Sequence, residues 1–211
     1  LHPEFAFLPR KFKISVTGGA QDRAALHWYD AGFHLVRNAA GELGLRVSAG
    51  GGMGRTPTIA TVLRQFLPWD QMLNYLEAII RVYNRYGRRD NVWKARIKIL
   101  VKAEGQRYID QVEEEYRQIV EVDGAPHTIT PDEFERVSRC FVAPDTAQRP
   151  TVEVRPIDAS ERVAFERWLA RNVTAHRDPT LRAVMLSFKR PGYAPGDATA
   201  EQMRAAADLA D

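Results

Sequence analysis

The sequence has few of the residues that build covalent cross-links or membrane spans. It contains a single cysteine, Cys140, so an internal disulfide framework and any zinc or iron–sulfur site made of several cysteines of this chain are excluded. No apolar run approaches the ~20 residues of a transmembrane helix. The first residues include no initiating Met, basic region or apolar stretch, so they are not a signal peptide, and they indicate a piece of a longer protein. We expect a protein of a reducing compartment, the cytoplasm, with no membrane partner.

The composition is that of an ordinary globular protein, with 45% hydrophobic and 27% charged residues. The net charge of +3 is small, but the charges are distributed unevenly. Between positions 81 and 98 the acid Asp90 stands among a run of basic residues, namely Arg81, Arg85, Arg88, Arg89, Lys94, Arg96 and Lys98. A local basic field on a nearly neutral chain indicates a polyanionic partner that docks at a defined place.

The first part of the chain alternates strand and helix patterns. Apolar alternation and turn signals predict strands at 12–17, 32–36 and 44–48. Thr56 followed by Pro57 has the residue types of a helix start and predicts a helix from there to Pro68. Helical spacing predicts further helices at 71–86, 93–102, 107–120 and from Pro131 to near Cys140. In the helix at 71–86, the residues expected to face the core are Leu73, Leu76, Ile80 and Tyr83.

These patterns predict an α+β fold in two parts. Residues 1–143 are expected to form a mixed sheet with helices packed on it, and residues 144–159 a linker. Residues 160–211 then begin a second, incomplete unit, in which 163–172 fits a strand or a helix and 181–189 fits a strand. A capping box at Thr199–Gln202 precedes a final alanine-rich helix. This unit leaves an apolar face without a partner, so we expect it to be truncated.

A glycine-rich loop is the first candidate site. Its residues are Gly50, Gly51, Gly52, Met53, Gly54, Arg55 and Thr56. Glycines allow a ligand to approach the backbone, the expected helix start would direct free N–H groups at it, and Arg55 adds a bidentate donor, so the loop predicts an anion site. It lacks the third glycine of the dinucleotide fingerprint and the lysine of a P-loop. The alternative is a tight turn without a ligand.

Two basic segments are the other candidates. Lys11 and Lys13 point to the same face of an expected strand, a pairing that suits a small anion, although the pattern alone favours lysines on a solvated sheet edge. In the second segment, Lys94 and Lys98 would share a helix face, with Arg96 turned away. That cluster fits a nucleic acid, an acidic partner, a cofactor with several carboxylates, or a solvated face.

Three stretches in this order, LPRKFKISVTG, GGGMGRTP and NRYGRRDNVWKARIKILV, resemble the sirohaem-dependent nitrite and sulfite reductases. They cover most of residues 8–103. The resemblance implies that 1–143 is the first sirohaem domain and that 160–211 is the start of the second ferredoxin-like half-domain. The cysteines that bind the family's [4Fe-4S] cluster would follow residue 211, in paired CxxxxxC and CxxxC motifs.

The resemblance also implies roles for particular residues. Lys11 and Lys13 would contact the substrate, and Lys13, where nitrite-reducing relatives often have Asn, favours sulfite over nitrite. Sirohaem would be held or supported by Arg10, the loop Gly50–Thr56, Arg88, Arg89, Asn91, Lys94, Arg96 and Lys98. The chain itself would supply no metal ligand, with Cys140 a buried or half-buried thiol, and it would be inactive and colourless alone.

The parent protein implied by the resemblance is a sulfite reductase that takes electrons from ferredoxin or a flavoprotein. Three alternatives remain open at this point. One is a nitrite reductase on the same scaffold, which produces ammonia. Another, from a different class, is a basic nucleic-acid-binding module that uses residues 81–98, whereas the reductase interpretation predicts no nucleic-acid partner. The last is a phosphate or nucleotide binder at the glycine-rich loop, which the missing P-loop lysine disfavours.

Overall fold

The structure is a computed structural model that describes residues 3–142, 156–189, 192–194 and 196–209. The chain divides into two compact units, Leu1–Phe141 and Val142–Asp211. Most of the linker expected at 144–159 lies outside the described residues. No helix among the described residues is long and apolar enough to cross a membrane.

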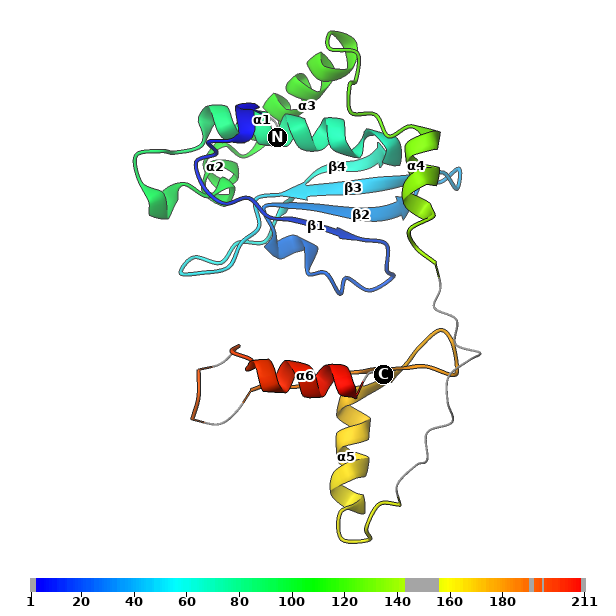
Figure 1. The fold of residues 1–211 in the computed structure, drawn as a ribbon. Coiled ribbons are helices and arrows are strands. Elements are labelled where there is room, and N and C mark those ends of the chain that lie inside the picture. Colours follow the sequence, from blue (N-terminus) through cyan, green and yellow to red (C-terminus); the bar gives the residue numbers. More distant parts are fainter. Residues whose placement is uncertain (1–2, 143–155, 190–191, 195, 210–211) are drawn as a thin grey trace. The chain divides into compact units, whose positions relative to one another are not determined.

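A four-stranded sheet forms the centre of the first unit, with the strand order β1-β2-β3-β4 (Figure 1). Its strands are β1 (Ile14–Thr17), β2 (Ala31–Arg37), β3 (Leu43–Ala49) and β4 (Thr61–Pro68). β1 and β2 are parallel, whereas the other neighbours are antiparallel, so the sheet is mixed, as predicted. The β2–β3 turn is fixed by Asn38, whose side-chain oxygen accepts the N–H groups of Ala40 and Glu42, and by Gly41 at φ +84°.

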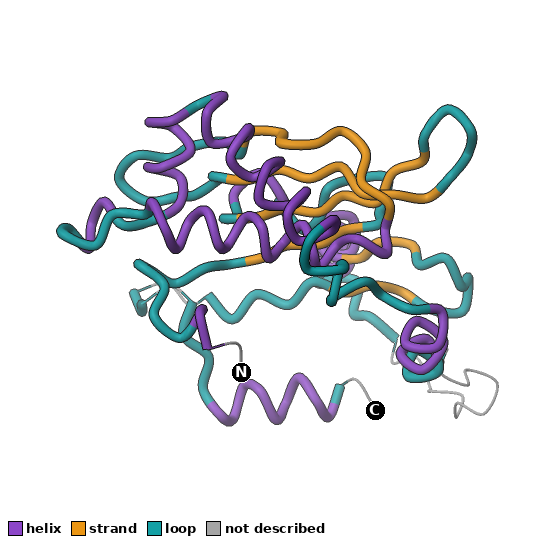
Figure 2. Tube along the Cα trace, turned by 90° about the horizontal axis from the view of Figure 1, so that it is seen from above, coloured by secondary structure: helices purple, strands orange, loops and turns teal. Residues whose placement is uncertain are grey.

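Helices cover one face of this sheet (Figure 2). They are α1 (Met72–Tyr86), α2 (Ile97–Glu104) and α3 (Gln106–Glu121), and α4 (Pro131–Ser138) follows them. Short 3₁₀ turns stand at Pro3–Phe5, Leu26–Trp28, Trp69–Gln71 and Val92–Lys94. The core lies between sheet and helices, where its largest fully buried side chains include Phe33, Tyr75, Tyr83 and Tyr108.

The prediction that a helix begins at Thr56 is wrong. Residues 50–60 form an extended loop, and the segment after it is the strand β4, which pairs with β3. Its apolar residues fitted helical spacing, but Leu63 and Leu67, four residues apart, also share one face of a strand, and they are its buried residues. Pairing with β3 therefore decided the structure over the local Thr-Pro signal.

The core face predicted for α1 is confirmed only in part. Tyr83 is buried and the half-buried Leu76 packs against the core, but Leu73 is exposed and Ile80 is only half-buried. The helix also buries two polar residues: Asn74 donates to Thr128 Oγ1 (3.0 Å), and Glu77 Oε2 contacts His127 Nε2 (2.6 Å). Partners from distant segments satisfy these polar groups, and apolar spacing carries no information about such partners.

The remaining helices of the first unit follow the predictions with shifted starts. α2 begins at Ile97 rather than near 93, because Asn91 caps a 3₁₀ turn by accepting the N–H of Trp93 (3.0 Å). α4 begins where expected, since the Thr130 hydroxyl accepts the N–H of Glu133 (3.2 Å). Cys140, which follows α4, is exposed, so the expectation of a buried or half-buried thiol is wrong. None of the residues of α4 itself is buried.

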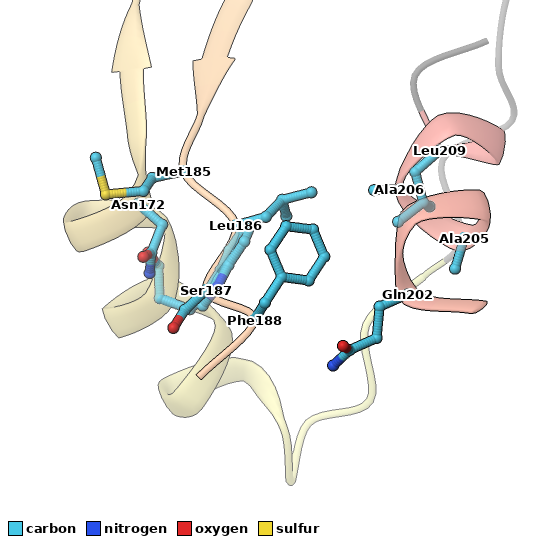
Figure 3. Close-up of a pocket in the computed structure, with 10 residues that line it drawn as sticks. Asn172, Met185, Leu186, Ser187, Phe188, Gln202, Ala205, Ala206 and Leu209 are labelled. Carbon is cyan, nitrogen blue, oxygen red and sulfur yellow. The ribbon is translucent and has the colours of Figure 1, made fainter. Parts of the chain in front are cut away.

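The second unit contains α5 (Arg162–Asn172), the hairpin of β5 (Val173–Ala175) and β6 (Arg182–Val184), and α6 (Ala200–Asp208). Of the two patterns that 163–172 fitted, the helix is the one formed. The strand expected over 181–189 is confined to β6, and the Thr199–Gln202 capping box is present. None of the described residues of this unit is buried. An apolar cleft is lined by Leu186 and Phe188 after β6 and by Ala205 and Ala206 of α6 (Figure 3).

Buried tyrosines make the stability of the first unit sensitive to alkaline pH. Burial and the nearby Asp30 raise the pKa of Tyr83 from 10.0 to about 12, and burial also raises the pKa of Tyr75 and Tyr108. Because the folded-state pKa exceeds the unfolded one, the stabilisation is complete below pH 10 and is lost as the pH rises through about 12. We predict that the free energy of unfolding, measured by urea titration, falls above pH 10 by at most about 1.4 kcal/mol per pH unit for each tyrosine.

Tyr83→Phe should reduce this alkaline loss, whereas Tyr86→Phe, on an exposed ring of the same helix, should leave it unchanged. An unfolding free energy that is equally flat from pH 8 to 12 in all three proteins would contradict the assignment.

Candidate anion and cofactor site

Sheet register gathers two of the predicted segments at one end of the sheet. Ile14 is paired with Ala31, Ala31 with Ala49, and Ala49 with Thr61. The residues just outside these positions therefore lie side by side, and they are Lys13, Asp30, Gly50 and Ala60. The lysine-bearing segment and the glycine-rich loop thus meet because the strands between them are aligned.

Asp30 is the junction of this end. Its side chain is 1% exposed. One carboxylate oxygen, Oδ2, accepts the backbone N–H of Lys13 (3.0 Å). The other, Oδ1, accepts Nη2 (2.7 Å) and Nε (3.2 Å) of Arg96, the residue before α2. The backbone carbonyl of Asp30 accepts the N–H of Gly50 (3.0 Å). A single residue therefore contacts all three segments that were singled out in the sequence.

The glycine-rich loop is a narrow hairpin. Its residues Gly50, Gly51 and Gly52 lie too close to neighbouring segments to carry a side chain. Gly50 has φ +86°. A Cβ on Gly51 would lie 2.3 Å from the carbonyl oxygen of His27, and a Cβ on Gly52 would lie 3.0 Å from Arg96 Nη1 and from Lys98 Cδ. Gly52 and Thr58 exchange two backbone hydrogen bonds of 2.9 Å. Since no helix begins at Thr56, the loop has no helix N-terminus to offer an anion.

Lys98 holds the glycine-rich loop through two hydrogen bonds. It is 6% exposed, and its ammonium group donates to the carbonyl oxygens of Met53 (3.1 Å) and Thr56 (2.6 Å). Burial, together with the neighbouring Arg96 charge, lowers its pKa. The prediction that Lys94 and Lys98 share a helix face with Arg96 turned away is wrong, because Lys94 lies in the preceding 3₁₀ turn and Arg96 lies against the same loop as Lys98.

Other predicted cations are exposed and available to a ligand. Among the described residues, none offers a hydrogen-bond or ion-pair partner to the side chains of Arg10, Lys11, Lys13, Arg55 and Lys94. The backbone next to them is held firmly, since the Tyr83 hydroxyl donates to Ala95 O (2.8 Å) and the Phe12 and Tyr83 rings lie 5.8 Å apart. Free cationic ends on a fixed backbone form a surface that can receive carboxylates or a small anion.

Arg88, Arg89 and Asn91 already have partners within the chain. Arg88 pairs with Asp90 on the surface (2.5 Å). Arg89 donates to the carbonyl of Phe7 (2.8 Å) and to Asn84 Oδ1 (2.6 Å), and so fastens the segment that precedes Arg10 onto α1. Asn91 is a helix cap. These residues therefore stabilise segments next to the site. In the contacts described, their side chains do not contact the glycine-rich loop.

The remainder of the basic run is neutralised by acids. Arg81 lies within 4 Å of carboxylates of Glu77, Glu115, Asp123 and Glu4, and Arg85 pairs with Glu115 (3.2 Å). These contacts raise the pKa of both arginines. The run 81–98 is therefore not a continuous basic surface of the kind that binds nucleic acid.

Comparison with known proteins gives the class to which this arrangement belongs. Residues 1–120 match the family described as Nitrite and sulphite reductase 4Fe-4S domain. The chain is a member of that family.

Curated relatives are sulfite reductases of two kinds. The chain is 36% identical over 134 residues to Sulfite reductase [ferredoxin] 1 of Mycolicibacterium paratuberculosis, covering 61% of this chain and 24% of the relative. It is 32% identical over 106 residues to the Sulfite reductase [NADPH] hemoprotein beta-component of Myxococcus xanthus, covering 47% and 19%. Among solved structures, Mycobacterium tuberculosis NirA is similar over 55% of this chain and 20% of that chain, with 32% identity and a TM-score of 0.48. The chain thus spans a quarter or less of the length of these relatives.

The residues present fit one of the family's two cofactors. The exposed side chains of Arg10, Lys11, Lys13, Arg55 and Lys94 are suited to a tetrapyrrole with many carboxylates. A [4Fe-4S] cluster needs four thiolates, and the sequence holds one cysteine, so this chain does not itself fit the cluster.

Asp30 is the site residue that the sequence did not reveal. It lies between Tyr29 and Ala31 with no recognisable motif around it. The one sequence feature that could have indicated it is an acidic residue directly before an apolar strand. A carboxylate buried at such a position needs hydrogen-bond partners.

We predict that Gly51→Ala lowers the free energy of unfolding by about 3 kcal/mol or more, because the new methyl group would meet two backbone carbonyls that cannot move independently. Gly18→Ala is the matched control. Its Cβ would be 3.7 Å from the nearest side-chain atom, so the change should be below about 1 kcal/mol. Urea unfolding of both variants measures the difference, and equal stabilities would contradict the close packing of the loop.

Proposed function

We propose that the chain is part of a sirohaem- and iron–sulfur-dependent sulfite reductase, which reduces sulfite to sulfide, and that residues 1–143 form its first sirohaem domain. The observation that carries the proposal is the Asp30 junction, which brings the Lys11–Lys13 segment, the glycine-rich loop and Arg96 together. Family membership and the sulfite reductases among the relatives support it.

In this proposal the residues divide the work by exposure. Lys11 and Lys13, both exposed, hold the sulfite dianion and deliver protons to its oxygens as they leave. Arg10, Arg55 and Lys94 receive carboxylates of sirohaem, and the loop Gly50–Thr56 lies against it. Arg96 and Lys98 hold the loop in place. Sirohaem, when bound, supplies the iron at which sulfite is reduced.

Several parts of the proposal concern the longer protein. Its electrons would come from ferredoxin or from a flavoprotein, the donor kinds in the names of the relatives being ferredoxin and NADPH. Residues 160–211 would begin a second ferredoxin-like half-domain. The enzyme would act in the cytoplasm, and the chain alone, which lacks the cluster's cysteines, would be inactive.

Reduction of nitrite to ammonia is the second candidate, because the same scaffold supports it and the family includes both activities. Lys13 favours sulfite, since a dianion gains more than a monoanion from a second ammonium group. The nucleic-acid alternative loses its basis with the neutralised run 81–98, and the phosphate alternative loses its basis with the missing helix start.

We predict that the reductase containing this chain has a higher kcat/KM for sulfite than for nitrite. Lys13→Asn should lower the sulfite value by on the order of 10², because one charged donor to the substrate is lost, and the nitrite value by less. Steady-state assays with both anions measure the effect.

Lys102→Asn is the matched control. It removes the same charge from an exposed position of α2 outside the site, and it should leave both rates unchanged. A preference for nitrite in the unmodified enzyme would contradict the choice of sulfite, and equal losses in the two variants would contradict the role of Lys13.

A further inference from the structure

Asp30 carries a negative charge into the middle of a site that is otherwise built from cations. The carboxylate is almost completely buried, at 1% exposure, and a buried carboxylate costs several kcal/mol unless its oxygens are paired and hydrogen-bonded. Here Oδ2 accepts the Lys13 N–H and Oδ1 accepts two nitrogens of Arg96. Among the conformations open to these segments, those that keep all three donors on Asp30 are therefore strongly preferred.

Asp30 holds the two cationic residues in different ways. Asp30 uses the backbone N–H of Lys13, so its ammonium group stays exposed. It uses Nε and Nη2 of Arg96, so Nη1 remains turned toward Gly52, where a Cβ would lie 3.0 Å away. The carboxylate thus fixes the backbone that carries the exposed Lys13 ammonium group, and it fixes the Arg96 guanidinium group against the glycine-rich loop.

We propose that Asp30 is a positioning residue of the anion site: it holds Lys13 and Arg96 in one array without touching the substrate. The inference rests on the proposed function and adds to it a residue that sets how well the site binds sulfite. It acts through Lys13 and Arg96 and takes no proton in the reaction.

Two explanations of the basic surface predict opposite changes in sulfite affinity when the charge of Asp30 is removed. If the basic surface merely attracts anions through its net charge, removing a negative charge strengthens sulfite binding. If Asp30 positions the cations, removing its charge weakens binding, because Arg96 loses its anchor and the Lys13 segment loses an acceptor.

The test is a titration of the 211-residue chain with sodium sulfite, followed by ¹H–¹⁵N NMR. We expect Asp30→Asn to weaken sulfite binding at least tenfold. Asp90→Asn is the matched control, because it removes the same charge from an exposed carboxylate paired with Arg88. Its affinity should be unchanged or slightly higher. Sulfite affinity in Asp30→Asn equal to or above that of the unmodified chain would overturn the proposal.

Asp30→Glu covers the case in which Asp30→Asn does not fold, as judged by the dispersion of its amide signals. It keeps the charge but adds a methylene group that displaces the array, and we expect binding to weaken at least threefold. Unchanged affinity in a folded Asp30→Glu chain would also overturn the proposal. A failure of the proposed function has a different signature, since the reductase that contains this chain would then not reduce sulfite.

Discussion

The burial of the Asp30 carboxylate is the constraint on which the rest of the site depends. A carboxylate removed from water must be given donors, and the sheet brings them from segments far apart in the sequence. Because the donors belong to the lysine-bearing segment and to the start of α2, satisfying one buried charge also assembles the cationic surface. Charge-assisted hydrogen bonds are about twice as strong as neutral ones, so this arrangement is favoured over looser ones.

The glycine-rich loop gains its shape from the same end of the sheet. The N–H of Gly50 donates to the Asp30 carbonyl, and the ammonium group of Lys98 donates to the carbonyls of Met53 and Thr56. An anion site there would depend on side-chain cations. It does not depend on a helix dipole, which makes the site unlike a nucleotide-binding loop in spite of the similar composition.

Much of the fold could be predicted from the sequence, because strands β1 to β3 and helices α1, α3 and α4 carry strong local patterns. β4 could not, since its helical spacing and Thr-Pro start were overruled by pairing with β3. The burial of the polar residues Asn74 and Glu77 could not be predicted for a related reason: their partners Thr128 and His127 come from a distant segment. The candidate segments of the site were recognisable by residue type and by family resemblance. Asp30, which joins them, has no local signature, because its role exists only once the strands are aligned.

Hydrogen exchange at the junction tests this account most directly. The backbone N–H groups of Lys13 and Gly50 and the Nε–H of Arg96 should exchange slowly and together, since all three are held by Asp30. Lys13 is the decisive residue, because its side chain is exposed and its amide lies just before an edge strand. A Lys13 amide that exchanges as fast as an open loop, while β2 and β3 remain protected, would contradict the central role given to Asp30.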